Sequence, residues 1–194
     1  WGDIIMMEYT DKYWKMIIPL VKKDLVRRFG KEEAASLIQK TDVVYRDMLN
    51  RADDIGKDNP MASNLYEGLL FLALWEAADG KISVDDLREI TRAVMQFPAM
   101  KLVGLFVNAN RSGLEKLEKR MHKNAEWLEV HPQYKGVSWD FNFDKTKHSE
   151  GFYYHFTRCP LNDFARREGY IEVLPVMCEI DLLSAELMHA KLIR

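Results

Sequence analysis

The sequence predicts an α+β protein, in which a helical N-terminal two thirds is followed by a small antiparallel β-hairpin packed with C-terminal helices. Apolar residues recur at helical spacing through most of residues 1–130. After His131-Pro132 the pattern changes to alternation of apolar and polar residues, which is typical of strands, and helical spacing returns at Pro160. We therefore expect a helical region over 1–130 and an α+β region over 131–194, packed together as one compact unit.

The composition is that of a globular protein with a substantial core, since 47% of the 194 residues are hydrophobic and 30% are charged. The 28 basic and 30 acidic residues give a net charge of −2, without the basic surplus typical of nucleic-acid binders. The longest strongly apolar run, Leu69 to Trp75, is far shorter than the roughly 18 to 20 residues that cross a bilayer. No secretory signal is recognisable over residues 1–10. We expect a soluble, cytoplasmic protein with reduced cysteines and neither nucleic-acid nor membrane partners.

Four helices and one polar loop are expected before residue 98: helices over 9–29, 31–50, 62–78 and 84–97, and the loop over 51–60. Pro19 is expected to kink or break the first helix. Because Leu69 to Trp75 is apolar on nearly every side, the third is expected to be a central, buried helix. Ser83 occupies the N-cap position of the fourth, with Asp85 and Asp86 in its first turn, where negative charge suits the helix dipole.

The rest of the chain predicts a long helix, a hairpin and two further helices: a helix over 102–127 with a loose joint at Ser112-Gly113, strands over 137–143 and 152–157, and helices over 160–168 and 171–191. In the first strand Val137, Trp139, Phe141 and Phe143 share one face, opposite Ser138, Asp140 and Asn142. Two strands make a marginal sheet, so we expect the hairpin to pack on helices or to gain strands elsewhere. Its unpaired edge also suggests a homodimer.

Most catalytic and nucleotide-binding signatures are absent, which directs attention to the junction at Cys159. This cysteine lies where the second strand ends and a helix begins, and the N–H groups of a helix N-terminus favour negative charge. Arg158 adds a neighbouring positive charge. Together these features are expected to lower the pKa of the Cys159 thiol toward a reactive thiolate.

The final helix carries a second group of candidates. Cys178 and Asp181 are three residues apart and therefore share a face, and the steps of four from Asp181 lead to His189. The residues permit three interpretations. In the first, Cys159 is a nucleophile or a partner of a substrate sulfur, and Asp181 is an acid or base. In the second, the cysteines, Asp181 and a histidine (His155 or His189) bind zinc or iron. In the third, both cysteines are core residues.

The residues from 155 to 191 resemble the L-2-amino-thiazoline-4-carboxylic acid hydrolase family. The resemblance rests on Phe-Thr-Arg-Cys-Pro at 156–160, followed by Glu168-Gly169, Pro175, Cys178 and Asp181. It implies hydrolysis of a small cyclic substrate, in which a thiazoline ring opens toward a carbamoyl-cysteine. The resemblance also implies a further strand with another Cys-Asp pair past the last helix, whereas this sequence ends at Arg194. At the other end, the absence of an initiator Met suggests a cut or a tag remnant.

The chemistry that the resemblance implies assigns a role to each candidate. Asp181 is the expected base for the attacking water. Cys159, Cys178 and His155 are expected to protonate the ring nitrogen or stabilise a departing thiolate. Arg158 is expected to bind the substrate carboxylate through a bidentate fork. A divalent metal is an open cofactor, which the sequence does not require, and the alternative function is a non-enzymatic module that binds a small ligand or metal in the same pocket.

Overall fold

The computed structural model describes residues 7–97, 111–143 and 151–193, and it confirms the α+β class. In chain order the elements are α1 (Asp11–Phe29), α2 (Lys31–Arg51), α3 (Ala62–Ala77), α4 (Val84–Met95), α6 (Arg111–Val130), the 3-10 helix η1 (Pro132–Tyr134), β1 (Asp140–Phe143), β2 (Tyr154–Arg158), α7 (Pro160–Glu168) and α8 (Leu174–Leu187). None of the helices among these residues is both long and apolar enough to cross a membrane.

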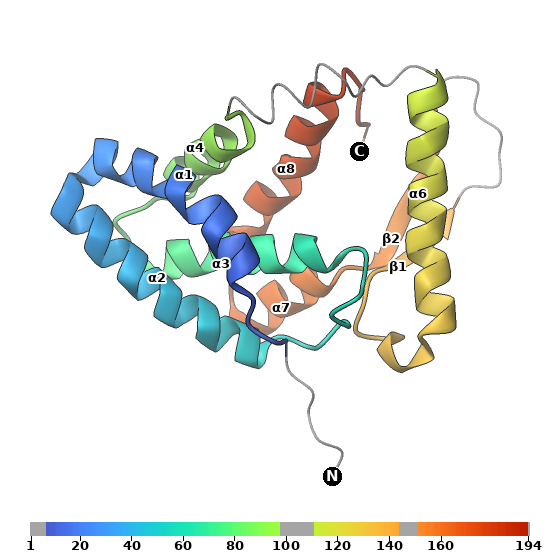
Figure 1. The fold of residues 1–194 in the computed structure, drawn as a ribbon, viewed down its shortest axis with the longest axis horizontal. Helices are drawn as coiled ribbons and strands as arrows, with labels where there is room; N and C mark the ends of the chain where they lie inside the picture. Colours follow the sequence, from blue (N-terminus) through green and yellow to red (C-terminus); the bar gives the residue numbers. More distant parts are fainter. Residues whose placement is uncertain (1–6, 98–110, 144–150, 194) are drawn as a thin grey trace, which may run out of the picture.

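The apolar helix α3 forms the centre of the molecule, as its sequence predicts. Residues 69–74 are all buried, and α3 contacts α1, α2, α4 and α7. In Figure 1 it runs across the middle, with α1 and α2 folded back on each other on one side and α7 below it. The run from Leu69 to Leu74 is therefore core, and Trp75 is partly buried against it.

Local signals fix the start of α4 and the connection that precedes it. The Ser83 hydroxyl accepts a hydrogen bond from the Asp86 N–H, and the Asp86 carboxylate accepts one from the Ser83 N–H. This capping box pairs two backbone donors that the helix itself leaves unpaired. The helix ends at Met95, two residues before the predicted end, and its buried face packs on α8 and α1.

One expected interruption of a helix, the break at Pro19, is not found. Helix α1 continues through Pro19, which is exposed, because buried residues on both sides, Ile17, Ile18 and Val21, hold this segment against the core. Helix α6 runs from Arg111 to Val130, so the joint expected at Ser112-Gly113 falls in its first turn, next to residues 98–110, which the structure does not describe. The predicted start of that helix at Leu102 lies outside the described residues.

The hairpin is shorter than the alternation of apolar and polar residues predicts, and one residue of its predicted polar face, Ser138, is buried. Strand β1 begins at Asp140 because Gly136, with φ of +92°, and a turn at Val137 occupy the preceding residues. β1 and β2 pair antiparallel with Phe141 opposite Phe156 and Phe143 opposite Tyr154, and an irregularity in register lies between Asp140 and Phe141.

The C-terminal helices join the hairpin to the helical core. Strand β2 leads directly into α7, which packs on α3, and α8 packs on α4. α8 extends over Leu174–Leu187 rather than over the predicted 171–191, and Pro175 lies in its first turn. One hydrophobic core contains residues from both the 1–130 and the 131–194 regions.

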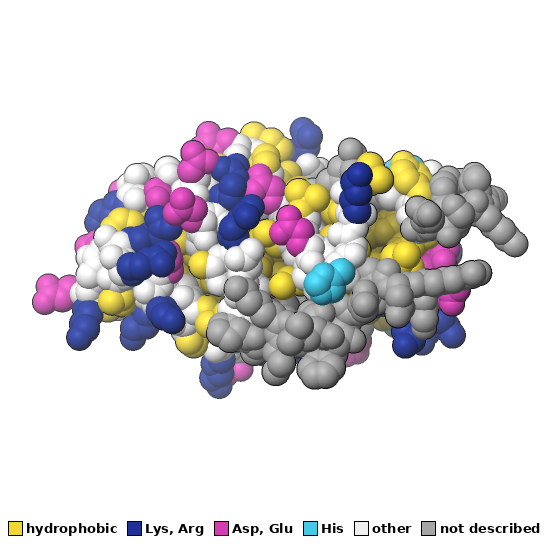
Figure 2. Space-filling view, turned by 90° about the horizontal axis from the view of Figure 1, so that it is seen from above, with side chains coloured by type: hydrophobic (Ala, Val, Ile, Leu, Met, Phe, Trp, Pro, Cys, Tyr) yellow, Lys and Arg dark blue, Asp and Glu magenta, His cyan; other side chains and the backbone are white. Residues whose placement is uncertain are grey.

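The outer surface is charged without being dominated by one sign. Figure 2 shows basic and acidic side chains interspersed over the helical part of one face. Several charged side chains of the described residues pair between elements, as in Arg88 of α4 with Glu179 of α8, where Nε and Oε2 are 2.8 Å apart. Exposed pairs of this kind contribute little stability each, but this one joins the two helices at their contact.

Candidate functional site

Cys159 lies at the junction between strand β2 and helix α7. It is the N-cap residue of α7, with extended backbone angles (φ −135°, ψ 111°), and Pro160 begins the helix. A proline favours extended geometry in the residue before it and suits the first turn of a helix, where no N–H partner is needed. The Cys-Pro pair therefore ends the strand and starts the helix at one point, and Figure 1 shows the chain passing from β2 beneath α3 into α7.

The Cys159 thiol is partly buried, and this reverses the predicted shift of its pKa. Burial raises the pKa of the thiol, because a thiolate loses solvation there. The N–H groups of Asn162 and Leu161 and the indole of Trp139 lower it, while the Asp163 carboxylate raises it. The net direction is upward. The expectation of a thiolate stabilised by the helix N-terminus is wrong because burial outweighs the N–H groups.

Arg158 does not act on the thiol as an unpaired positive charge. Its Nη1 donates to Oδ2 of Asp163 at 2.7 Å, and the two side chains are 42% and 36% exposed. Asp163 lies in the first turn of α7. Its negative carboxylate therefore offsets the positive charge of the Arg158 guanidinium. The guanidinium keeps further N–H donors for an anionic ligand, which is compatible with the predicted carboxylate anchor.

Helix α8 presents Cys178 and Asp181 on its exposed side, as their spacing predicts. The opposite side of α8 is buried through Val176, Met177 and Leu183. The strongest influences on the Cys159 thiol come from α7 and Trp139, and none of them comes from α8. Cys159 and Cys178 do not form a disulfide.

Two histidines lie apart from the thiol. His155 is exposed and precedes Cys159 by four residues of extended chain, which separates their backbones by about 13 Å. His189 lies beyond the end of α8 with φ of +57°. The predicted continuation of the Asp181 face to His189 is therefore wrong, because the helix ends at Leu187.

The described residues, which include every proposed ligand, contain no group of three or more His, Cys, Asp or Glu side chains placed to hold a metal ion. The interpretation of Cys159, Cys178 and Asp181 as a metal centre with a histidine therefore has no support in this arrangement. Zinc and iron sites need three or four such ligands within about 2.0 to 2.3 Å of one point.

The hairpin adds an aromatic face next to the junction. Phe141 meets Phe156 edge to face at 5.0 Å, and the His122 ring of α6 stacks on Phe143 at 4.0 Å. Phe156 remains 37% exposed and pairs with Phe141, whereas Arg158 pairs with Asp140, the residue before Phe141. Because consecutive strand residues point to opposite faces, the aromatic face and the Arg158 guanidinium belong to different sides of the hairpin.

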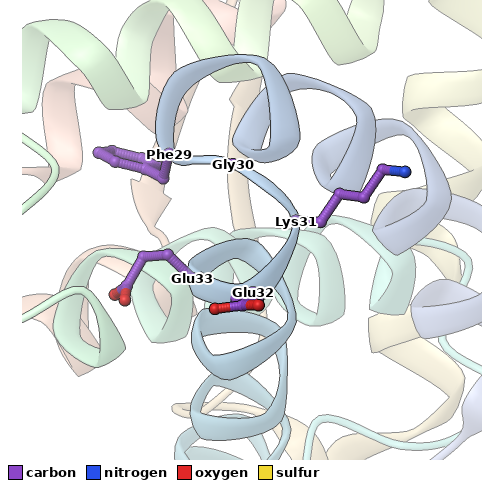
Figure 3. A pocket seen from close by; sticks show the side chains of 5 residues that line it. All are labelled: Phe29, Gly30, Lys31, Glu32 and Glu33. Carbon is purple, nitrogen blue, oxygen red and sulfur yellow. The ribbon is translucent and has the colours of Figure 1, made fainter.

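Two hollows in the described surface lie elsewhere. One, with residues Phe29 to Glu33, is at the α1–α2 turn, and Figure 3 shows its side chains diverging from the turn. Glu33 there pairs with Lys81. A second lies between α1 and α3 and is lined by Tyr9, Tyr13 and Tyr66 among others. Neither contains a residue that the sequence selected.

The fold and the junction define an α+β protein with a cysteine between a strand and a helix, and the comparisons identify its family. The family model for L-2-amino-thiazoline-4-carboxylic acid hydrolase matches residues 63–194, about two thirds of the chain. The chain belongs to this family, as its resemblance predicted. No curated protein and no solved structure matches it.

Sequence reasoning missed two residues that shape the junction. Alternation places Trp139 only on the apolar face of a strand, yet it is buried and its indole acts on the Cys159 sulfur. Asp163 is not among the residues that the sequence selected. Its signal was available, because an acidic residue in the first turn after Cys-Pro lies within reach of the strand that precedes it.

Proposed function

We propose that this protein is a hydrolase that opens a small cyclic isothiourea such as 2-amino-thiazoline-4-carboxylate to a carbamoyl-cysteine. The observation that carries this proposal is the position of Cys159 at the strand–helix junction, close to the N–H groups of α7 and to Asp163, which pairs with Arg158. Together with the family membership, it supports a site for a small anion with a proton donor beside it. A cytoplasmic location is part of the proposal, since free thiols persist there.

The reaction consumes one water and needs two proton transfers. Water attacks the amidine carbon of the ring and loses a proton to a base, for which Asp181 is proposed. Breaking the ring C–N or C–S bond leaves an amine or a thiolate that takes up a proton. Because burial raises the pKa of Cys159, we assign it the role of proton donor rather than of nucleophile. Cys178 is proposed as a secondary participant, and His155, whose backbone is about 13 Å from that of Cys159, receives no role.

Arg158 is proposed to bind the carboxylate of the substrate. A guanidinium recognises a carboxylate through two parallel N–H···O bonds, which fixes the orientation of the ring as well as its position. A cation close to a protonated thiol matches the carboxylate of this small substrate and the proton that its ring opening takes up.

The test is a mass-spectrometric assay with 2-amino-thiazoline-4-carboxylate, in which the expected product is heavier by one water. We expect Cys159→Ala and Asp181→Asn to abolish turnover while the melting temperature stays nearly unchanged. Arg158→Gln is expected to raise KM. Its matched control is Arg167→Gln, because Arg167 is equally exposed and also pairs with an aspartate, at the other end of α7.

The alternative function is a module that binds a small ligand without turnover. Saturable binding of the thiazoline carboxylate that is lost in Arg158→Gln, with no product in the wild-type protein, would favour that alternative. Product formation that survives Cys159→Ala would remove Cys159 from the mechanism.

A further inference from the structure

The ion pair between Arg158 and Asp163 joins two residues on either side of Cys159 in the sequence. Arg158 is the last residue of β2, Cys159 is the N-cap of α7, and Asp163 lies in the first turn of that helix. The 2.7 Å contact between Nη1 and Oδ2 therefore joins the end of the strand to the first turn of the helix, and the Asp163 carboxylate is close enough to the Cys159 thiol to raise its pKa. Both charged groups are exposed enough for a dissolved anion to reach them.

The pair is exchangeable on physical grounds. An exposed ion pair gains little over two separately hydrated ions, so a second carboxylate with two oxygens placed for the guanidinium fork can compete with Asp163. Substrate at Arg158 would displace the Asp163 carboxylate from the same donors. Asp163 therefore competes with the substrate for Arg158, and it orients Arg158 when no substrate is bound.

Asp163 also belongs to the surroundings of the thiol. Its charge acts on Cys159 in the same direction as burial and against the N–H groups of Leu161 and Asn162, so it favours the protonated sulfur. Arg158 donates to Asp163 from β2 and so offsets part of this negative charge.

We propose that Asp163 is a positioning residue of this site, which holds the Arg158 guanidinium beside Cys159 and releases it to the carboxylate of the substrate. The proposal rests on the proposed function for the identity of that substrate. Asp163 itself touches no reacting atom. Its role is to keep the anion-binding donors oriented and the neighbouring sulfur protonated until the substrate arrives.

The first test measures alkylation of Cys159 by iodoacetamide as a function of pH, in a Cys178→Ala background so that one thiol reports. In Asp163→Asn the midpoint of the pH profile is expected at lower pH, with faster alkylation at neutral pH, because a nearby negative charge has been removed. Asp53→Asn is the matched control, since Asp53 pairs with Arg167 at the far end of α7. A profile in Asp163→Asn that coincides with the control would overturn the proposal.

The second test uses protection of Cys159 from alkylation by 2-amino-thiazoline-4-carboxylate. Asp163→Asn is expected to lower the half-protecting concentration, because the substrate no longer competes with the aspartate, and Arg158→Gln is expected to abolish protection. An unchanged half-protecting concentration would overturn the exchange. Protection and the pH shift without turnover in any variant would instead defeat the proposed hydrolysis and leave the positioning role standing. Asp163→Ser repeats both measurements if the asparagine variant unfolds.

Discussion

The Asn59 amide donates a hydrogen bond to the Ser138 hydroxyl at 2.8 Å, and both side chains are buried. The same amide group donates to the Ile55 carbonyl, and the Asn59 side-chain oxygen accepts from the Met61 N–H. One side chain thus ties the loop before α3 to the turn before β1. Because Ser138 precedes Trp139, this contact holds in place the segment that reaches the Cys159 sulfur.

Asn59→Ala is expected to destabilise the protein by about 1–3 kcal/mol, since it leaves buried groups without their hydrogen-bond partner. Urea unfolding followed by circular dichroism measures this change. Ser138→Ala is expected to cost less, because it removes one of these contacts. Asn64→Ala, at an exposed position in α3, is the control and should stay within about 0.5 kcal/mol of wild type. Equal stability of Asn59→Ala and this control would contradict the prediction.

Gly56 allows α6 and η1 to approach the loop before α3. Its φ is +90°, and a Cβ there would lie 2.8 Å from the Trp127 ring and 2.8 Å from the Tyr134 ring. Gly56→Ala is expected to cost about 1–2 kcal/mol of backbone strain and about 1–3 kcal/mol from overpacking. Gly136→Ala measures the backbone strain alone, because the φ of Gly136 is +92° and a Cβ there would have no neighbour within 4 Å. If thermal melts show equal losses of stability for Gly56→Ala and Gly136→Ala, overpacking against the two rings makes no contribution.

Tyr45 is fully buried, and its hydroxyl has no hydrogen-bond partner among the described residues. Burial raises the pKa of this hydroxyl well above its usual range, so the group stays neutral. Tyr45→Phe is expected to stabilise the protein by about 1 kcal/mol, because it removes an unpaired polar group and keeps the ring. Tyr66→Phe should have the opposite sign, since the Tyr66 hydroxyl donates to the Glu8 carbonyl at 2.7 Å. Urea midpoints that move in the same direction for both variants would refute this.

Burial raises the pKa of the Glu67 carboxyl, with the charge of Lys12 acting in the opposite direction. A carboxyl with a higher pKa in the folded state contributes stability below its unfolded pKa and loses that contribution as pH rises through the folded pKa. Glu67→Gln should therefore gain stability over wild type between mildly acidic and neutral pH. Urea unfolding across this range measures the gain, and the exposed Glu172→Gln corrects for effects common to this substitution. A gain that shrinks as pH rises would contradict the sign.

Short-range sequence signals predicted several of the boundaries between helices, strands and turns. Ser83 and Asp86 are three residues apart, and the capping box they form depends on nothing else. The same holds for Cys159-Pro160, which predicts the change from strand to helix. Pro19 shows the limit of such reasoning, because tertiary contacts of its neighbours keep α1 continuous where the local preference predicts a break.

The candidate site was located by sequence and characterised by structure. The residue order around Cys159 sufficed for the family, and the family model confirms it over residues 63–194. The state of the thiol did not follow from that order, because it depends on how much solvent the fold removes. The placement of Ser138 inside, rather than on the polar face, follows from a partner that precedes it by 79 residues.

The sequence by itself determined the helices, the hairpin, the strand–cysteine–helix junction and the family, because caps, periodicity and a short spaced motif act over a few neighbouring residues. Tertiary structure alone decided that Cys159 is partly buried, that Trp139 reaches its sulfur and that Asn59 anchors Ser138. Burial and long-range hydrogen bonds depend on distances between elements. Residue order limits those distances, and only the packing of the helices against the hairpin sets them.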